Sequence, residues 1–181
     1  MALIHHPVLS KNGDVIASAV TNLDLHDIAR TSKTYGVGRF YVVTPLEDQA
    51  ELVRKIIDHW VSGAGAVYNP IRREALLLLR VKASFEEVLA DIRRKGAGDP
   101  VTVATSAKPR VPGLSFGELK GMLKTGERPV VLALGTAWGL TEAFIGRADY
   151  TLEPITGGTA YNHLPVRSAA AIMLDRLLGR G

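Results

Sequence analysis

The sequence contains no cysteine among its 181 residues, which excludes a disulfide scaffold and metal sites built on thiolates. It also has no apolar run of about 18 residues or more, and no basic start followed by an apolar segment. The first absence excludes a membrane-spanning helix, and the second excludes a secretion signal. We therefore expect a cytoplasmic protein that has no contact with a membrane.

Nucleotide-binding fingerprints are absent or misplaced. A P-loop requires Gly-Lys followed by Ser or Thr, and the sequence has no such tripeptide. The glycines of a dinucleotide-binding motif follow the first strand, whereas the glycine-bearing segments here follow a late strand. Serine-hydrolase elbows and zinc-protease motifs are absent as well. These absences disfavour nucleoside triphosphates, NAD and two common classes of hydrolase.

The composition is that of a globular protein, with 46% hydrophobic and 22% charged residues. A chain of this length without an internal repeat or a low-complexity linker is expected to form a single domain over residues 1–181. Its net charge of +4 and pI near 9.5 favour a polyanionic partner such as RNA or DNA. Basic domains that bind no nucleic acid are also common, so the charge alone leaves this point open.

Apolar runs with strand character alternate with segments of helical periodicity, which predicts an α/β fold with an open, mostly parallel sheet and helices on both faces. Asp24 is expected to cap the first helix and Gly36 to end it. The adjacent His5 and His6 face opposite sides of the first strand, which makes them poor joint metal ligands, and no metal is expected. The expected strands are 3–9, 39–45, 75–81, 101–107 and 130–135, and the expected helices are 24–35, 46–61, 84–95, 115–125 and 166–178.

Ligands of such sheets lie beyond the carboxyl ends of the strands, and three segments expected at that edge have residues that suit a ligand site. They are residues 105–109, 134–140 and 153–165. Glycines allow a ligand to approach main-chain N–H and C=O groups closely. The alternative is that Gly135 and Gly139 only end a strand and permit a turn. The three segments together favour a small-molecule site built from main chain.

Two parts of the sequence resemble the SPOUT superfamily of RNA methyltransferases. LALGTAWGLTEAFIGRADYTLEPI and HLPVRSAAAIMLDRLL are similar to its cofactor-binding C-terminal half, and TNLDLHDIARTSKTYGVGRFYVVTP resembles the N-terminal motif of its SpoU branch. The resemblance implies a deep trefoil knot, with the C-terminal helix threaded through a loop, and a homodimer with that helix near the interface. It also implies S-adenosylmethionine as cofactor and RNA, either tRNA or rRNA, as substrate.

The same resemblance assigns the cofactor site to the three segments 105–109, 134–140 and 153–165. Trp138 would be either a lid or part of the core, and Glu153 would meet the cofactor through its side chain or its main chain, or be an exposed strand end. The implied cofactor-binding residues are Thr105, Ser106, Leu134, Gly135, Thr136, Ala137, Trp138, Gly139, Leu140, Glu153, Pro154, Ile155, Asn162, His163 and Leu164.

Arg30 and Asn22 stand at the characteristic Arg and Asn positions of the SpoU motif, which makes them the candidate catalytic residues. Arg30 would activate a ribose hydroxyl or anchor a phosphate. The phosphate role is physically favoured, because a guanidinium does not readily lose its proton and is a poor base. Asn22 would shape the loop or contact the acceptor nucleotide, or be an ordinary residue at a helix start. Arg30, Lys33 and Arg167 are the candidate RNA contacts, and a surface salt bridge is the alternative for Arg167.

The C-terminal motif departs from the SpoU pattern. Residues 163–167 read His-Leu-Pro-Val-Arg where that pattern has Ser-Leu-Asn-Val-Ser. Pro165 suits the first turn of a helix, so the fold tolerates the exchange. The resemblance slightly favours ribose 2′-O methylation, and base methylation, for example at guanine N1, stays open. A module of the same fold that binds RNA or S-adenosylmethionine without catalysis is the alternative function.

Overall fold

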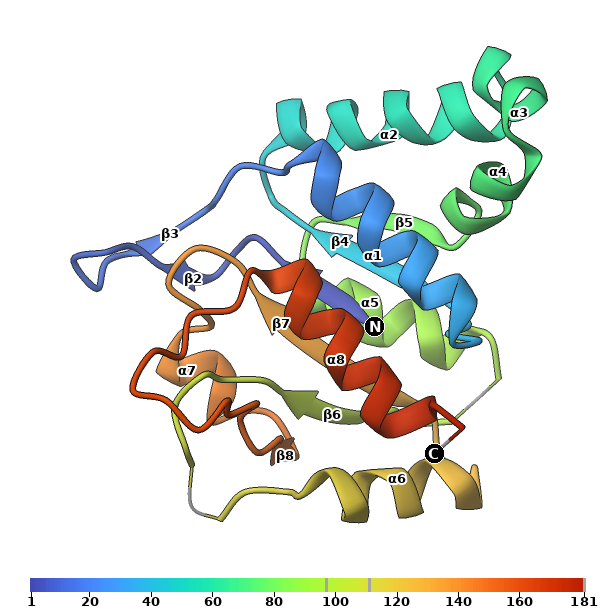
Figure 1. Ribbon diagram of the computed structural model, residues 1–181. Helices are drawn as coiled ribbons and strands as arrows, with labels where there is room; N and C mark the ends of the chain where they lie inside the picture. The colour runs from blue at the N-terminus through green and yellow to red at the C-terminus, as the bar shows by residue number, and fades with distance from the viewer. Residues whose placement is uncertain (97, 111, 181) are drawn as a thin grey trace.

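Six parallel strands form the centre of the computed structural model, which describes residues 1–96, 98–110 and 112–180. Every neighbouring pair in this sheet is parallel, and a short antiparallel pair, β2 (Val8–Leu9) and β3 (Val15–Ile16), projects beside it (Figure 1). Across the sheet the strands are β5 (Leu79–Lys82), β4 (Phe40–Val43), β1 (Ala2–Ile4), β7 (Val130–Gly135), β6 (Val101–Ala104) and β8 (Tyr150–Thr151).

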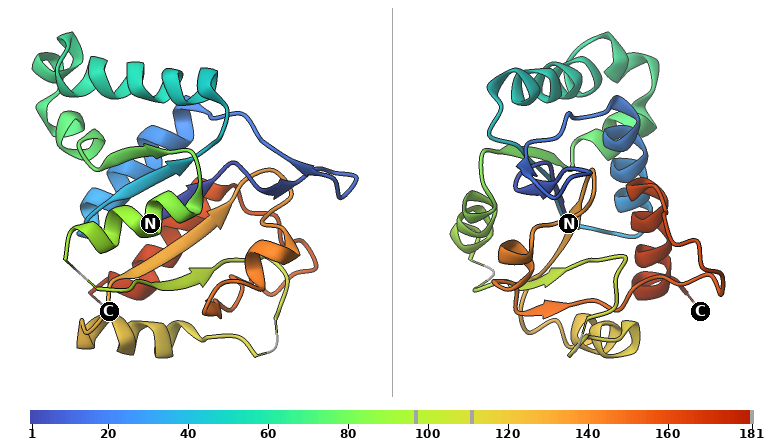
Figure 2. Two further views of the ribbon diagram at one scale, coloured as in Figure 1. Left: turned by 180° about the vertical axis from the view of Figure 1, so that it is seen from behind. Right: turned by 90° about the vertical axis from the view of Figure 1, so that its left-hand side faces the viewer.

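The helices cover both faces of the sheet, which Figure 2 shows edge-on in its right-hand view. One face carries α1 (Asn22–Thr34), α2 (Glu47–Val61), α4 (Pro70–Leu76), α6 (Phe116–Thr125) and α8 (Val166–Leu178). The other face carries α5 (Phe85–Arg94) and the short α7 (Glu142–Ile145), and α3 (Ala64–Tyr68) joins α2 to α4.

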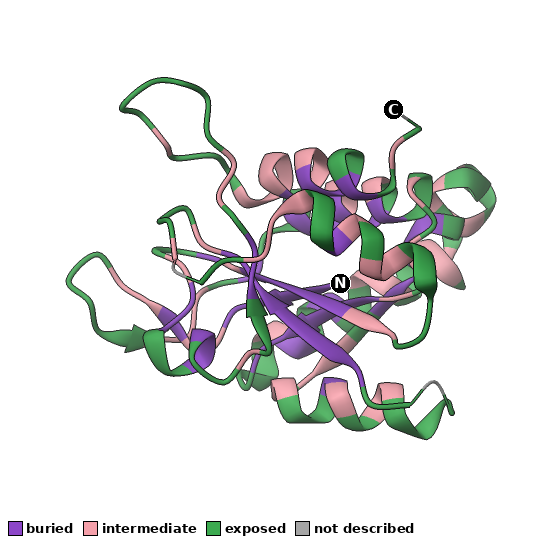
Figure 3. Ribbon diagram, turned by 90° about the horizontal axis from the view of Figure 1, so that it is seen from below, coloured by how far each residue is buried: buried purple, intermediate pink, exposed green. Residues whose placement is uncertain are grey.

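Alternation along the strands divides the core into two layers. In β1, Leu3 belongs to the layer under α1 and α8, whereas Ala2 and Ile4 belong to the layer under α5 and α7. This is the period of two that a strand imposes on its side chains. The central strands β1, β4, β6 and most of β7 are buried, while the outward faces of the helices are exposed (Figure 3). The expected α/β fold with a parallel sheet and helices on both faces is confirmed; the knot stays a prediction.

Two expected element boundaries were wrong. Residues 75–81 are not one strand, because α4 continues to Leu76 and β5 begins only at Leu79. Asn69 begins that helix by accepting a hydrogen bond from the Arg72 N–H, and Pro70 suits its first position. The expected first strand, 3–9, is divided between β1 and β2.

All six strands are parallel, but the sheet is extended to one side of β1 first and to the other side afterwards, so a switch point lies between β1 and β7. From β1 the chain builds outward through β4 to β5, then crosses to the other side, where β7 lies between β1 and β6. In open α/β sheets, ligands bind beyond the carboxyl ends of the strands at such a switch point. Within the described ranges, no helix has the length and apolarity to cross a membrane. The same residues contain no cluster of three or more His, Asp or Glu side chains suited to a metal ion.

Candidate cofactor and RNA site

The three segments 105–109, 134–140 and 153–165 follow the carboxyl ends of β6, β7 and β8, so they lie at one edge of the sheet. A direct bond links the first and third segments, because the Asn162 side-chain amide donates to the Ala107 carbonyl oxygen at 3.0 Å. Just before these segments, the Leu152 N–H donates to the Ala104 carbonyl oxygen at 2.9 Å. The first segment is also tied to α7, because the Arg110 guanidinium makes two 2.6 Å bonds to the Glu142 carboxylate. The structure thus brings the three predicted segments together.

The turn after β7 is the most tightly built of the three. A Cβ added to Gly135 would lie 2.6 Å from the Leu140 nitrogen and 2.9 Å from the Gly139 carbonyl carbon, both main-chain atoms. Ala137 and Gly139 have positive φ angles of 49° and 99°, which bend the chain back. The Trp138 N–H donates to the Leu9 carbonyl oxygen, so β2 holds the turn in place. The glycines therefore do end a strand, and the turn they form is held rigidly at the edge of the sheet.

Four predicted cofactor residues have side chains that belong to the interior. They are Thr105, Leu134, Thr136 and Leu140, each less than 10% exposed. The Thr105 hydroxyl donates to the Ala133 carbonyl oxygen at 3.0 Å. Any contact that Leu134 or Leu140 makes with a ligand must therefore come from its main chain, as the sequence analysis expected for this loop.

A buried chain of polar groups connects this turn to β1 and to the segment before α1. The Thr136 hydroxyl lies 2.9 Å from the Ile4 carbonyl oxygen and 2.5 Å from the Ser18 hydroxyl, which in turn lies 3.0 Å from His5 Nδ1. A carbonyl oxygen only accepts, so Thr136 donates to Ile4 and Ser18 donates to Thr136. Ser18 then accepts from His5, which places the imidazole proton on Nδ1.

His5 is fully buried, and its Nε2 has no hydrogen-bond partner among the described residues. Burial lowers the pKa of His5 to about 4, although the nearby Asp24 carboxylate acts in the opposite direction. The ring is therefore neutral at pH 7. The sequence places His5 on the first strand as a poor joint metal ligand with His6, and nothing in the local pattern indicates a bond network that reaches Thr136.

The third segment contains both anchored and exposed residues. The Glu153 carboxylate accepts a 2.7 Å hydrogen bond from the Phe116 N–H at the start of α6, and Ile155 packs against the core. The Glu153 N–H donates to the Leu114 carbonyl oxygen, so the carbonyl oxygen of Glu153 is the group better placed to face a ligand. Pro154 is partly buried, whereas His163 and Leu164 are exposed. Trp138, in the turn after β7, is 62% exposed, which removes the alternative that its ring is core packing.

The candidate RNA residues lie on α1 and at the start of α8, which pack side by side (Figure 1). Asn22 is the first residue of α1 and is exposed, and Arg30 is exposed two turns later. The expected cap was wrong: Thr21 caps this helix, because its hydroxyl accepts from the Asp24 N–H, while the Asp24 carboxylate accepts from that hydroxyl. Asp24 is the third residue of the helix.

Two of the three candidate RNA cations have carboxylate partners within the chain. Arg167 lies 3.2 Å from Asp24 and 3.7 Å from Asp27, so a salt bridge joins α8 to α1. Lys33 Nζ lies 3.3 Å from the Glu74 carboxylate. Arg30 makes no ion pair with the residues that the structure describes.

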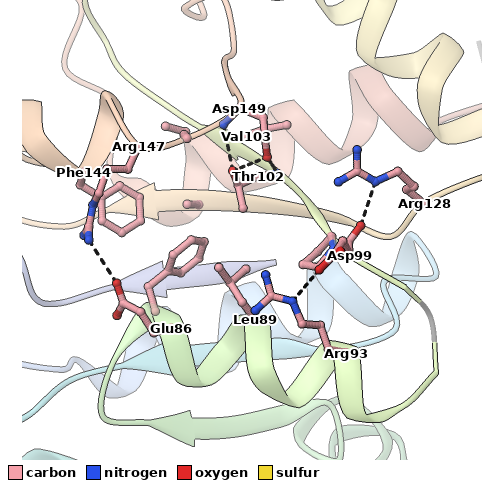
Figure 4. Close-up of a pocket in the computed structure, with 15 residues that line it drawn as sticks. Glu86, Leu89, Arg93, Asp99, Thr102, Val103, Arg128, Phe144, Arg147 and Asp149 are labelled. Atoms are coloured by element: carbon pink, nitrogen blue, oxygen red, sulfur yellow. Dashed lines mark hydrogen bonds and ion pairs between the residues drawn. The ribbon is translucent and has the colours of Figure 1, made fainter.

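Two cavities of about 460 and 440 Å³ lie away from these segments. Figure 4 shows the first, between α5, α7 and β6, with the apolar Leu89 and Phe144 and several charged residues along its lining. Those charges are paired internally, for example Arg93 with Asp99 at 2.6 Å, and the Asp149 carboxylate accepts from Thr102. The second is lined mainly by apolar residues of α6, α8 and the amino-terminal ends of the strands. Neither coincides with the predicted cofactor segments.

A parallel α/β sheet with a glycine-bearing turn at its switch point is typical of a domain that binds a small molecule, and comparison with known proteins identifies the family. A family model described as SAM-dependent RNA methyltransferase matches residues 1–179, so the chain belongs to that family. A tRNA (guanine-N(1)-)-methyltransferase of Oleidesulfovibrio alaskensis is 43% identical over 98% of this chain. The chain spans 41% of that relative's length.

Two further likenesses agree with this membership. An uncharacterized protein of Aquifex aeolicus is 35% identical, and the match covers 99% of this chain and 88% of that protein. The crystal structure of the SpoU methyltransferase AviRb from Streptomyces viridochromogenes, in complex with AdoMet, has a TM-score of 0.57. It is 19% identical over 98% of this chain and 59% of AviRb, which shows the fold alone. The expected resemblance and the expected cofactor, S-adenosylmethionine, are confirmed at the level of the family.

Proposed function

We propose that this domain transfers the methyl group of S-adenosylmethionine to a tRNA, and that the three segments at the carboxyl ends of β6, β7 and β8 hold the cofactor. The observation that supports the placement is the turn after β7, at the switch point of the sheet. The whole of residues 1–181 would act as one methyltransferase domain in the cytoplasm.

The residues of these segments fit such a cofactor. No heavy atom lies within 4 Å of the position where a Cβ would stand at Gly139 or Gly157, so no side chain blocks the approach of a ligand to these two glycines. The Gly139 N–H already donates to Thr136 and its carbonyl oxygen accepts from Leu9, so other main-chain groups of the segments would contact an adenine edge and ribose hydroxyls. The main chain of 134–140, 153–155 and 162–164 would hold the cofactor, with Thr105 and Ser106 at its border.

The cofactor supplies a methyl group already activated on a sulfonium, so the protein has to place the acceptor and manage its proton. Arg30 is exposed and makes no ion pair among the described residues, and a guanidinium group is a poor general base. Its role is therefore to position an RNA phosphate rather than to act as a base. Asn22, exposed at the start of α1, would orient the acceptor nucleotide.

The names of the relatives favour tRNA over rRNA and guanine N1 over the ribose 2′-hydroxyl. Two curated tRNA (guanine-N(1)-)-methyltransferases are 43% and 44% identical to this chain, although the chain spans only 41% of each. The ribose preference that the SpoU motif suggested has no support from these names. The missing Asn and second Ser of that motif, at Pro165 and Arg167, agree with a different acceptor.

A labelling experiment tests the proposal. The purified protein is incubated with methyl-labelled S-adenosylmethionine and tRNA from a strain that lacks the gene, and the RNA is digested to nucleosides. Label in 1-methylguanosine supports the base, and label in a 2′-O-methylnucleoside supports the ribose. Cofactor and RNA binding without any transfer would favour the non-catalytic module instead.

A homodimer is part of the proposal. Helix α8 is apolar over most of its surface, and Leu178 stays 38% exposed at its end. A helix of this kind is suited to burial beyond its own domain. Light scattering on the purified protein should give twice the mass of one chain, and a monomeric mass would remove this part.

A further inference from the structure

A cluster of basic and aromatic residues lies on the side of α1 that faces α2 and α4. His26 and Trp60 meet edge to face, with ring centroids 5.4 Å apart, and the Arg72 guanidinium lies 4.6 Å from the centre of the same Trp60 ring. Trp60 therefore brings a residue of α1 and a residue of α4 together. Arg30 follows His26 by four residues, which puts both on one face of α1.

The cluster carries positive charge that the chain does not neutralise. Among the residues that the structure describes, neither Arg30 nor Arg72 makes an ion pair, whereas Lys33 and Arg167 do. The first turn of α4, where Arg72 lies, contains no acidic residue. A cation is unfavourable there because of the helix dipole, so the chain itself gains little stability from this charge.

Two nitrogen atoms of the cluster also lack partners. His26 Nδ1 and Arg72 Nε are buried and accept or donate no hydrogen bond within the described residues. Burial and the positive charges of Arg72 and Arg30 lower the pKa of His26, although Asp27 opposes them. His26 is thus mainly neutral at pH 7, and the net charge of the site comes from the two arginines.

We propose that Arg72, which stacks on Trp60, and Arg30, on the same side of α1 as His26, form a binding site for a phosphodiester of the RNA substrate. Two guanidinium groups fit an anion with several acceptor oxygens, and Arg is the residue best suited to phosphate. This inference rests on the proposed function, and it adds Arg72, Trp60 and His26 to the RNA contacts that the sequence indicated. The RNA then lies across α1 toward α4.

The test measures tRNA binding to the whole protein over a range of salt concentrations. Arg72→Gln should weaken binding about tenfold at low salt and reduce the slope of log affinity against log salt by about 0.9. Arg72→Lys, which keeps the charge, should restore most of the slope. The control is Arg93→Gln on α5, across the sheet, which should leave both quantities unchanged. Thermal unfolding of each variant separates lost affinity from lost folding.

The outcomes distinguish this inference from the function on which it rests. If the wild-type protein neither binds nor methylates tRNA, the proposed function fails. If it does both and Arg72→Gln keeps the wild-type affinity and slope, the phosphate site is overturned. The binding of inorganic phosphate is also measured for the wild type and Arg72→Gln at constant ionic strength. If Arg72→Gln weakens phosphate binding but leaves tRNA binding unchanged, the cluster is an anion site unrelated to RNA. That result also contradicts the inference.

Discussion

Replacing Gly135 by alanine should disrupt cofactor binding more than any other single methyl group added to the described glycines of the three segments. The new Cβ would lie 2.6 Å from the Leu140 nitrogen and 2.9 Å from the Gly139 carbonyl carbon. These are main-chain atoms of a turn that β2 holds in place, so a rotamer change cannot relieve the overlap. Overpacking of this kind costs about 1 to 3 kcal/mol, which corresponds to a fall in Tm of roughly 2 to 12 °C.

The assay combines thermal unfolding with calorimetric titration of S-adenosylmethionine. We expect Gly135→Ala to remain folded at 20 °C yet to bind the cofactor at least about tenfold more weakly, because a displacement of about 1 Å in a rigid site has an effect of this order. Gly121→Ala is the matched control: this glycine lies in α6, is exposed and has no heavy atom within 4 Å of the added position. It should gain about 0.5 to 1 kcal/mol of stability and bind the cofactor as before.

The reasoning would be refuted by a Gly135→Ala protein with wild-type Tm. A destabilised variant with unchanged cofactor affinity would refute a narrower point, that the turn after β7 contacts S-adenosylmethionine. The two results are separable because stability and affinity are measured independently on the same sample.

Two further predictions concern the buried polar chain. Thr136→Val leaves the Ser18 hydroxyl without its acceptor and should cost about 1 to 3 kcal/mol, whereas Thr136→Ser should cost less; equal unfolding midpoints in urea would contradict this. His5 stays neutral in the folded protein to a pKa of about 4, while the unfolded chain takes up the proton near 6.5. Stability should therefore fall by up to about 3 kcal/mol as the pH drops between those values. The free energy of unfolding of the wild type minus that of His5→Asn should fall as the pH drops through this range. A difference that does not change with pH would contradict the prediction.

Several elements could be predicted because a local pattern was sufficient. The buried apolar runs at β4, β6 and β7 have strand character, and Ser84 and Ser115 mark the starts of α5 and α6 by accepting hydrogen bonds from the third helical residue. The glycine-bearing segments were placed correctly at one edge, since parallel strands bring their carboxyl ends together.

Other features depend on contacts that periodicity does not contain. The run of four leucines at 76–79 suits a helix and a strand equally. Asn69 and Pro70 start a helix that continues to Leu76, and the strand begins only at Leu79. The bond between Ser18 and Thr136 joins residues 118 positions apart. The internal partners of Lys33 and Arg167, and the meeting of Arg72 with Trp60, depend in the same way on how α1, α4 and α8 pack.

The central claim is that this chain moves a methyl group from S-adenosylmethionine to RNA. Its most direct test is the amount of label that the wild-type protein transfers to tRNA from a strain lacking the gene, measured beside Gly135→Ala and Gly121→Ala. With the cofactor kept below its wild-type Kd, the account predicts transfer by the wild type and by Gly121→Ala, and transfer reduced about tenfold or more by Gly135→Ala. Absence of label from every RNA offered to the folded wild-type protein, together with no calorimetric binding of the cofactor, would contradict it.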